Sequence, residues 1–429
     1  MNCYLNYGSR RIDFELPSSW TLITQGSPAW YPENENVKKE INRALDNPVG
    51  SLRIEDIAKP KMAVVILFDD LSRPTPAYLA FPELLRRLNL AGVKDKDITA
   101  LCALGTHSPL SNEELKQKIG DEAFSRLSPR VLNHNSFATN NVIIGKTSYG
   151  SLIEVNPLVL NADLVIGIGS CIPHPLSGFG GGSKIIMPGI SSIQAVKDHH
   201  IKWRRNPKLD MGAFDGNPFH QEQDEYAKMM GLILKIDFVL NEKTQVVKVY
   251  FGEVISEHKK AVEECKKVYS VKIPKLSDVT IASAYPLDQR LPQTFKGLDT
   301  ATRVTRAGGH IILAAANEKS DKFLDMIDAL ASVKSANDYH KDLMAGHYNP
   351  PCPPYGIDFH IGCLSVKISQ EKFSGIIYVT DKISKVLVEK MGFTHTTSIE
   401  QALALVKNEV SNAEALVLPA AGTALPDFE

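Results

Sequence analysis

The sequence lacks an excess of charge of either sign. Its 429 residues contain 48 lysines and arginines against 49 aspartates and glutamates, for a formal net charge of -1. No global field therefore favours nucleic acid or an anionic membrane surface, and any anion has to be bound by a local site. We predict a protein without nucleic-acid or membrane partners.

Long apolar runs and targeting patterns are also missing. No stretch approaches the roughly 18 consecutive apolar residues typical of a membrane-spanning helix. The start, "MNCYLNYGSRRIDFELP", has neither the order of charged and apolar regions found in a signal peptide nor an acid-poor amphipathic pattern. We therefore expect a cytoplasmic protein.

Several motifs that would identify other classes of protein are absent. The six cysteines are dispersed and form no CxxC pair, which argues against a disulfide scaffold and a structural zinc site. No GxxxxGK[ST], GxGxxG or GxSxG occurs. These absences argue against a P-loop, a dinucleotide fingerprint and the nucleophile elbow of a hydrolase.

What is present is a repeated pattern of apolar strand, polar turn and amphipathic helix. Strands are indicated at residues 62–68, 97–105, 140–145 and 162–170, and a hairpin at 234–252. The pattern predicts α/β architecture. A proline-containing segment near residue 272 then leads into a second α/β unit that begins with "VTIASAYP".

We accordingly predict two α/β domains with a cofactor and substrate cleft between them. The first domain spans residues 1–272 and the second spans residues 273–429. The last segment of the second domain has the option of packing back on the first.

Polar residues follow two of the predicted strands at their carboxyl ends, where open α/β sheets place their ligands. "DDLSRPTP" brings Asp70 and Arg73, with Ser72 or Thr75 as alternative caps of the next helix. "LGTHSPLSNEEL" brings His107, followed by a capping-box pattern. Arg73 could instead form an ordinary surface ion pair, and His107 could be structural.

The segment "CIPHPLSGFGGGSK" (171–184) combines a histidine, a lysine and many glycines. Glycines let backbone N–H groups approach an anion closely, and a helix starting near Ser183 would favour phosphate. The candidate residues follow: His174, Ser177, Gly178, Gly180, Gly181, Gly182 and Lys184. A plain mobile loop is the alternative.

Two further segments carry candidate ligands. In "VKDHHIKW" the adjacent His199 and His200 should point to different sides of a helix, so that only one faces a given site. In "YPLDQRLPQTFKGLD" Gln293 and Lys296 lie one helical turn apart and could hold a carboxylate. A solvated helix start is the alternative for the second segment.

Taken in order, these segments resemble the nickel-pincer lactate racemase family over almost the whole chain. The resemblance is carried by "DxSRPTP", "GTH", "HPLSGFGGGSKIIMPGI", "HH" and "QTFKG", and by "DGNPFHQEQDEYAKMMG" (215–231). It implies an isomerase that inverts C2 of a 2-hydroxy acid by reversible hydride transfer. The ordered set is far more specific than any single member.

The resemblance also implies a cofactor and residue roles. Nickel(II) is held by a pyridinium-3,5-bisthiocarboxylic acid mononucleotide that is covalently attached at Lys184, with His200 as the protein ligand and the glycine-rich loop beside the phosphate. His107 and His174 act as acid and base. Arg73, Lys296 and Gln293 bind the substrate with assistance from Asp70, and Asp70 and Ser177 are also counted among the residues that bind the cofactor. Cofactor-synthesis and nickel-insertion enzymes are the implied partners.

One departure from the family pattern concerns the substrate. Pro292 stands where simple lactate racemases carry an aromatic residue, and the segment near Tyr355 supplies no tryptophan. We therefore expect a substrate larger or more polar than lactate, for example a sugar acid. An NAD(P)-type 2-hydroxy acid dehydrogenase and a non-catalytic sugar-acid or nucleotide binding protein remain the alternative functions.

Overall fold

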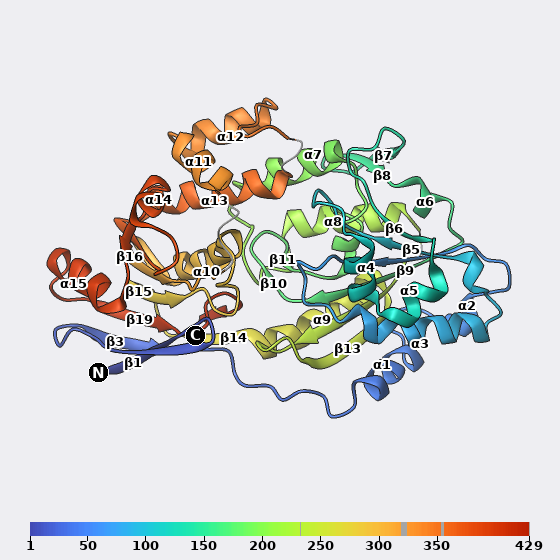
Figure 1. The fold of residues 1–429 in the computed structure, drawn as a ribbon, viewed down its shortest axis with the longest axis horizontal. Helices are drawn as coiled ribbons and strands as arrows, with labels where there is room; N and C mark the ends of the chain where they lie inside the picture. Colours follow the sequence, from blue (N-terminus) through green and yellow to red (C-terminus); the bar gives the residue numbers. More distant parts are fainter. Residues whose placement is uncertain (232, 319–323, 353–355, 429) are drawn as a thin grey trace. The chain divides into compact units, whose positions relative to one another are not determined.

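The computed structural model describes residues 1–231, 233–318, 324–352 and 356–428, which form two compact units. The middle unit is Tyr31–Val268, and the split unit combines Met1–Trp30 with Tyr269–Glu429. Each unit contains a six-stranded sheet with helices around it (Figure 1). The α/β class and the two-domain organisation predicted from the sequence are thereby confirmed.

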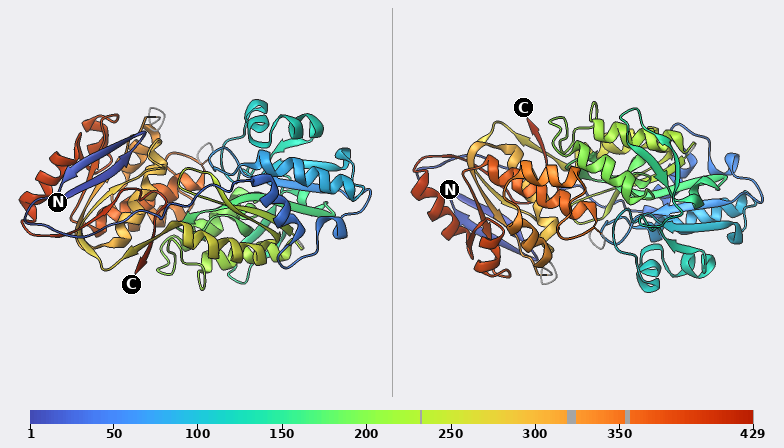
Figure 2. Two further views of the ribbon diagram at one scale, coloured as in Figure 1. Left: turned by 90° about the horizontal axis from the view of Figure 1, so that it is seen from below. Right: turned by 90° about the horizontal axis from the view of Figure 1, so that it is seen from above.

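The middle unit is built on a sheet of order β13-β12-β9-β4-β5-β6, parallel except for β13. Its strands are β4 (Val64–Phe68), β5 (Ile98–Cys102), β6 (Val131–Asn133), β9 (Leu164–Cys171), β12 (Ile233–Leu240) and β13 (Val246–Glu253). Its longer helices are α1 (Val37–Asp46), α3 (Ala77–Leu90), α4 (Asn112–Ile119), α5 (Asp121–Leu127), α7 (Ile193–Trp203), α8 (Pro218–Met229) and α9 (Val254–Tyr269), with short α2 (Ile54–Ile57) and α6 (Pro157–Leu160). Helices lie on both sides of this sheet (Figure 2).

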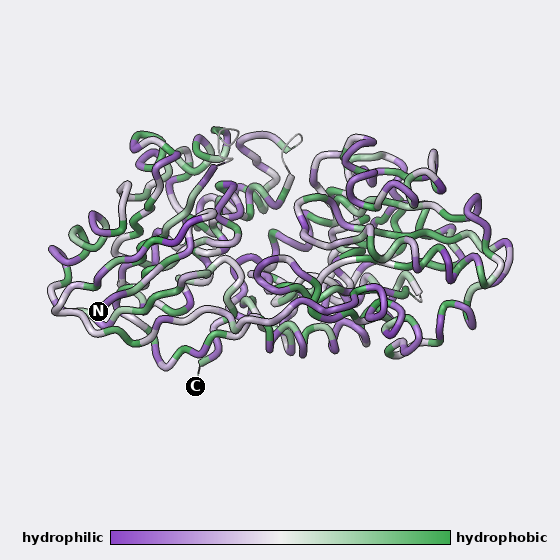
Figure 3. The backbone as a smooth tube through the Cα atoms, turned by 60° about the horizontal axis from the view of Figure 1, so that its bottom comes forward, coloured by the Kyte–Doolittle hydropathy of each residue, from purple (hydrophilic) through white to green (hydrophobic). Residues whose placement is uncertain are grey.

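The four inner strands of the middle sheet are largely apolar and buried. All five residues of β4 are buried, as expected for a parallel strand covered on both faces. One face of the sheet forms a continuous apolar core with α1 and α3, to which β9 contributes Ile166 and Ile168. In Figure 3 hydrophobic stretches run through the interior of each unit.

Two smaller predictions for the middle unit have different outcomes. The hairpin predicted over residues 234–252 is confirmed, since β12 and β13 pair antiparallel. The strand predicted at 140–145 is not part of the main sheet. It forms β7 (Val142–Lys146), which pairs antiparallel with β8 (Leu152–Val155) in a separate hairpin. A short run of apolar residues does not by itself distinguish these two settings.

The split unit has a fully parallel sheet of order β18-β17-β16-β15-β19-β3. Its sheet strands are β3 (Thr21–Gln25), β15 (Ser277–Ser283), β16 (Thr305–Ala314), β17 (Gly375–Val379), β18 (Thr394–Thr396) and β19 (Glu414–Leu418). The smaller strands are β1 (Asn2–Tyr7), β2 (Arg10–Glu15), β14 (Ser270–Ile273) and β20 (Leu425–Phe428). Its helices are α10 (Leu291–Val304), α11 (Leu324–Ser332), α12 (Ala336–Met344), α13 (Ile357–Lys372), α14 (Lys385–Lys390) and α15 (Ile399–Glu409).

The first thirty residues differ from the predicted domain assignment. They were expected in a domain of residues 1–272, but β3 pairs with β19 and the β1–β2 hairpin buries Leu5 and Phe14 in the core of the split unit. The division at residue 268 lies close to the predicted boundary. The last strand, β20, pairs with β14 inside the split unit. The N-terminal strands were assigned to the domain that follows them in the sequence, but they pack on the other one.

None of the helices in the described ranges is both long and apolar enough to cross a membrane.

Candidate active site

An aspartate and a histidine meet at the ends of two neighbouring strands. Asp70 follows β4 and His107 follows β5, and these strands pair in parallel with Phe68 opposite Cys102. His107 Nδ1 lies 2.5 Å from Asp70 Oδ2. An ionised carboxylate can only accept, so Nδ1 donates and the lone pair of the neutral ring is on Nε2. His107 is thus prepared to accept a proton at Nε2.

The carboxyl group of Asp70 is stabilised in its ionised form. It is buried and also accepts the Ser72 N–H at 2.7 Å. Burial alone would raise the pKa of Asp70, but the hydrogen bond and charge of His107 lower it well below its usual value. An imidazolium formed at His107 would therefore have an anion beside it.

The turn after β4 is held by a buried lysine. Lys118 Nζ lies 2.7 Å from Asp69 Oδ1 and donates to the carbonyl oxygens of Asp70 and Arg73 at 2.9 and 3.1 Å. Thr75 donates to Asp69 at 2.5 Å and does not cap α3, which has no side-chain cap. The alternative interpretation, in which Ser72 or Thr75 caps this helix, is therefore wrong.

The position of Arg73 leaves its predicted role open. Its guanidinium donates to Ser72 Oγ at 2.9 Å on the exposed side of the turn. The surface ion pair with Asp69 or Asp70 is not among the ion pairs of the described residues. Arg73 nevertheless adds positive charge beside Asp70. A cation at this strand end is compatible with holding a carboxylate.

His174 has the opposite arrangement of ring nitrogens. It ends β10 (Pro173–His174), which turns back into β11 (Gly178–Phe179). Its Nδ1 accepts the backbone N–H groups of Leu176 and Ser177 at 3.3 and 3.1 Å. The proton of the neutral ring is therefore on Nε2. In this state His174 is a hydrogen-bond donor at Nε2, whereas His107 is an acceptor.

Ser177 is used to hold this turn in place. It is buried and its Oγ donates to Gln223 Oε1 at 2.6 Å. Gln223 Nε2 in turn donates to the carbonyl oxygen of Met187 at 2.8 Å, and Asn217 Nδ2 donates to that of Leu176 at 2.8 Å. Helix α8 and its N-cap, from the motif "DGNPFHQEQDEYAKMMG", therefore hold the segment at Leu176 and Ser177. The sequence singled out this motif without indicating that role.

The glycines of the segment pack against the protein more than they open toward an anion. Gly180 N–H donates to Ile172 O at 2.7 Å and Gly182 N–H donates to Asp237 Oδ2 at 2.7 Å. Instead of a long helix near Ser183 there is a short 3₁₀ turn over Gly182–Ile185. The predicted phosphate cradle therefore loses two of its N–H groups and its helix N-terminus.

The lysine of the segment lies in this turn. Lys184 is half-buried, and it is among the positive charges that lower the pKa of His199 in α7. The turn and α7 therefore bring the predicted attachment residue and the paired histidines into one region. The neighbouring Ser183 Oγ donates to Asp224 of α8 at 2.6 Å.

The two adjacent histidines contact each other instead of pointing to different sides. Their ring centroids are 5.0 Å apart, and Nδ1 of His199 lies 3.2 Å from Nδ1 of His200. His199 Nε2 donates to the Phe219 carbonyl oxygen at 3.0 Å, and burial lowers the pKa of His199 to about 3. The neutral His199 therefore accepts from His200 Nδ1–H. In the neutral ring this places the lone pair of His200 on Nε2, and a metal ligand has to offer such a lone pair.

These observations test whether the chain fits a metal-bearing nucleotide of the expected kind. His200 uses Nδ1 toward His199 and keeps Nε2 as the nitrogen that could bind a metal, and Lys184 offers an amine in the same region. Both fit. The phosphate position does not fit Gly180 and Gly182, whose N–H groups are already donated.

The predicted carboxylate-binding pair belongs to the split unit. Gln293 and Lys296 are both half-buried on α10, one turn apart, while Thr294 and Phe295 face the core. Their shared face agrees with the spacing in the sequence. Pro292 lies in the first turn of this helix. Tyr355 lies outside the described residues.

Sequence reasoning missed a group of buried charged residues on the other face of the middle sheet. Lys235 and Asp237 of β12 and Glu257 and His258 of α9 are each at most 1% exposed. A signal was present in "LKIDFVL", where two charges occupy alternate positions of an apolar strand and must share one face.

Comparison with known proteins decides the family. The chain matches the lactate racemase N-terminal domain over residues 7–212 and the lactate racemase C-terminal domain over residues 273–425. It belongs to the lactate racemase family. As a lactate racemase family member it is an enzyme of the isomerase class, a racemase.

Individual relatives agree with this assignment. Lactate racemases from Thermoanaerobacterium thermosaccharolyticum and Lactiplantibacillus plantarum are each 31% identical over 319 residues, covering 73% and 72% of this chain and 74% of each relative. The structure of the lactate racemase apoprotein from Thermoanaerobacterium thermosaccharolyticum covers 100% of both chains with a TM-score of 0.86 at 26% identity. A Thermotoga maritima protein, at 21% identity, covers 93% of this chain and 100% of its own with a TM-score of 0.66, which shows the fold.

Proposed function

We propose that this racemase inverts C2 of a 2-hydroxy acid, with a nickel-pincer nucleotide attached at Lys184 and His200 as the protein ligand of nickel. The observation that carries the proposal is the Asp70–His107 pair at two adjacent strand ends in a chain of this family. The tautomer of His200 supports its assignment as ligand. When bound at Lys184 and His200, such a group would supply a reversible hydride acceptor for C2 of the substrate.

The protein residues supply the proton chemistry. His107 Nε2 accepts the hydroxyl proton of the substrate while Asp70 balances the charge that develops on the ring. His174 Nε2–H donates to a substrate oxygen in the same state. To give the product hydroxyl its proton, His174 has to be an imidazolium with a proton on each ring nitrogen, so its Nδ1 has to leave the two N–H groups of its turn. Turnover in the opposite direction then exchanges the roles of the two histidines.

The substrate carboxylate is assigned to cationic and amide groups. Arg73 lies beside the Asp70–His107 pair, and Lys296 and Gln293 share one face of α10. A guanidinium can bind a carboxylate through two parallel hydrogen bonds. Pro292 leaves no aromatic ring at its position, which favours a substrate larger or more polar than lactate, for example a sugar acid.

Production together with cofactor-synthesis and nickel-insertion enzymes tests the cofactor. We expect an added mass on the peptide of Lys184 and about one nickel per chain, both lost in Lys184→Arg. His200→Ala should keep the added mass and lose most of the nickel. The proposal fails if neither appears in a preparation in which another lactate racemase is loaded in parallel.

A screen of 2-hydroxy acids deuterated at C2 tests the reaction. Deuterium retained at C2 of the inverted product supports hydride return, whereas exchange with solvent indicates enolisation and contradicts the proposal. Turnover of a sugar acid with kcat/KM above that of lactate supports the substrate assignment, and the reverse order contradicts it.

The same preparation separates the alternative functions. A binding protein would retain the ligand and show no turnover before or after replacement of His107. A dehydrogenase would require added NAD(P) and would accumulate a 2-oxo acid. We expect turnover without added NAD(P) and without accumulation of a 2-oxo acid. In His107→Gln this turnover should be abolished while the ligand is still bound.

A further inference from the structure

The buried charged cluster, which we define as Lys235, Asp237, Glu257 and His258, has no place in the reaction described above. Lys235 and Asp237 alternate along β12 and point to the same face. Opposite them on β9 stand Gly167 and Gly169. A Cβ at Gly167 would lie 2.5 Å from Lys235 Cδ. The glycines of β9 therefore make room for the lysine.

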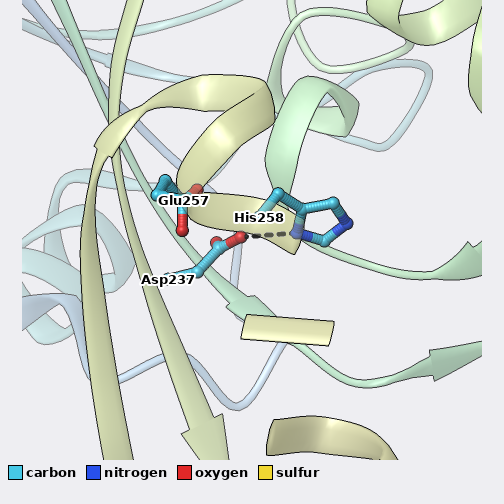
Figure 4. Close-up of side chains that lie close together, drawn as sticks. All are labelled: Asp237, Glu257 and His258. Carbon is cyan, nitrogen blue, oxygen red and sulfur yellow. Dashed lines mark hydrogen bonds and ion pairs between the residues drawn. The ribbon is translucent and has the colours of Figure 1, made fainter. Parts of the chain in front are cut away.

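The two carboxylate oxygens of Asp237 have separate partners. Oδ1 forms an ion pair with Lys235 Nζ. Oδ2 accepts His258 Nδ1–H at 3.0 Å (Figure 4) and the backbone N–H of Gly182 at 2.7 Å. Burial acts to raise the pKa of Asp237, but the charge of Lys235 and the hydrogen bond from His258 lower it well below its usual value. The anion is therefore retained inside the protein.

The glycine-rich segment rests directly on this cluster. A Cβ at Gly181, which has a φ of +91°, would lie 2.4 Å from Asp237 Oδ2. A Cβ at Gly182, with a φ of +51°, would lie 2.5 Å from His258 Cγ. Only glycine fits this backbone so close to a carboxylate and an imidazole. Lys184 follows two residues later in the same turn.

The cluster resembles a cation site but already contains its cation. One ligand atom each from Asp237, Glu257 and His258 lies within 4.8 Å of the others, and both Glu257 oxygens lack a hydrogen-bond partner among the described residues. Lys235 supplies positive charge at Asp237. Burial and the charge of Asp237 raise the pKa of Glu257 well above its usual value, which favours its neutral form. The charges then balance without a metal ion.

We propose that Asp237 is a positioning residue whose Oδ2 holds the Gly182 N–H and thereby fixes the turn that presents Lys184, before any cofactor is attached. The expected effect of Asp237 on cofactor loading rests on the proposed attachment at Lys184. The hydrogen bond by which Asp237 holds the turn does not depend on that proposal. Gly181 and Gly182 are then required because they pack on the cluster. The phosphate of the proposed nucleotide has to be bound by other groups.

Two double variants isolate the hydrogen bond at matched charge. Lys235→Met with Asp237→Asn removes the ion pair but leaves a carbonyl oxygen where Oδ2 lies, whereas Lys235→Met with Asp237→Leu removes the acceptor as well. Hydrogen exchange of the peptide spanning residues 178–187 is measured in the cofactor-free full chain. A hydrogen bond to a charged group corresponds to about a ten- to hundredfold change in local opening. We expect the exchange of this peptide to be accelerated by that factor in the variant with Asp237→Leu. In the variant with Asp237→Asn the acceleration should be less than about a third as large on a logarithmic scale.

A second pair of variants covers the case in which the double variants do not fold. Gly182→Ala should accelerate exchange in the same peptide because its Cβ meets His258. Gly150→Ala is the control, since Gly150 also has a positive φ of +85° but nothing within 4 Å of a Cβ. Equal exchange in the leucine and asparagine variants, or in the two alanine variants, would overturn the proposal.

Loading and metal content complete the test. With the cofactor-synthesis enzymes present, the fraction of chains modified at Lys184 should fall at least about tenfold in the leucine variant and less in the asparagine variant. Equal loading would overturn the positioning role. A wild-type chain that is never modified refutes the proposed function, while hydrogen exchange still decides on Asp237. One divalent cation per cofactor-free chain, lost in Glu257→Gln, would show a metal site instead.

Discussion

His107 and His174 differ in which ring nitrogen is already used by the protein. Nδ1 of His107 donates to a carboxylate, and Nδ1 of His174 accepts two backbone N–H groups. A carboxylate partner favours the imidazolium form, whereas N–H donors at Nδ1 exclude a proton from that atom. The two residues that we propose as acid and base therefore differ in the folded protein, and single substitutions can show the difference.

Replacement of Asp70 by asparagine should slow proton transfer more than substrate binding. The amide still fits beside His107 Nδ1 but provides no charge for the imidazolium. Since general acid–base catalysis contributes about 10² to 10⁴ in rate, we expect kcat to fall at least about a hundredfold with a smaller change in KM. Steady-state kinetics of the loaded enzyme measure both constants.

Asp163→Asn is the matched control for this substitution. Asp163 accepts the backbone N–H of Ala63, which precedes β4, so this contact lies at the opposite end of β4 from Asp70. Its replacement should leave kcat within about twofold. If Asp70→Asn also keeps kcat within about twofold of the wild type, His107 does not depend on the carboxylate, and the role assigned to Asp70 is wrong.

His134 makes the stability of the folded chain depend on acid. Burial lowers the pKa of His134 to about 4, while its Nε2 donates to the Ser191 carbonyl oxygen. In the unfolded chain His134 is protonated below about pH 6.5, whereas in the folded chain it is protonated only below about pH 4. This contribution to stability is complete above pH 6.5 and is lost as the pH falls toward 4.

His134→Gln removes that single titration. Relative to the variant, the wild type should lose about 1.4 kcal/mol of unfolding free energy per pH unit between pH 6.5 and 4. Urea unfolding of both chains at pH 7 and pH 5 measures the difference. Asn156→Ala removes the N–H donor at His134 Nδ1, which makes protonation of the folded ring easier, so the pH dependence of its stability should be weaker than that of the wild type. Parallel pH dependence of wild type and His134→Gln would contradict the assignment.

Contacts between adjacent strand ends could be predicted from the sequence, and contacts between distant segments could not. Asp70 and His107 follow consecutive strands of a parallel sheet, so their proximity follows from topology. Asp237 reaches Gly182 across 55 positions only because β12 joins β9 in the sheet, and strand order is not encoded locally. The charge pair in "LKIDFVL" indicated a buried polar face without naming its partner.

At the scale of elements, α8 combines a helix cap with support of the histidine turn. Asn217 Oδ1 accepts the N–H groups of Phe219 and His220, and its Nδ2 donates to the carbonyl oxygens of Leu176 and Ala213. One buried side chain thus starts the helix and fixes the turn beside it. The capping box predicted for α4, by contrast, is present but serves its own helix alone.

Asn217→Asp should separate these two functions. Aspartate caps a helix as well as asparagine does, but it brings no N–H donor and turns a charge toward two carbonyl oxygens. We expect a loss of about 1 to 3 kcal/mol of unfolding free energy together with faster hydrogen exchange of residues 174–180. The helical content of α8, followed by exchange of its own amides, should persist.

Ser111→Ala is the element-scale control. It removes the cap of α4 at an exposed position and should cost about 1 kcal/mol without any effect on residues 174–180. If Asn217→Asp leaves the exchange of the turn unchanged, α8 does not support His174 through this residue.

The two units of the whole molecule are not consecutive in the chain. The middle unit owns a complete sheet and apolar core, while the split unit takes an edge strand and a hairpin from the first thirty residues. The sequence pattern predicted the number of units, since each repeats the strand and helix alternation. It could not assign residues 1–30, because a hairpin and one short strand fit against either sheet.

Fragments of the chain test this division. We expect residues 31–268 to give a folded product alone, with cooperative thermal unfolding by circular dichroism. Residues 269–429 should fold poorly alone and recover on addition of residues 1–30 as a separate piece. Cooperative folding of residues 273–429 alone, with no gain from the N-terminal piece, would contradict the assignment.

The pairing of β3 with β19 imposes an order on the synthesis of the chain. Thr21 aligns with Glu414, so the N-terminal strand emerges about 390 residues before its partner exists. At a translation rate of about 5 to 20 residues per second, it waits on the order of 20 to 80 s. During that time the middle unit can fold behind it, and the exposed edge of β3 has no native neighbour. The start of this protein is therefore the part that a ribosome-bound chaperone has most time to meet.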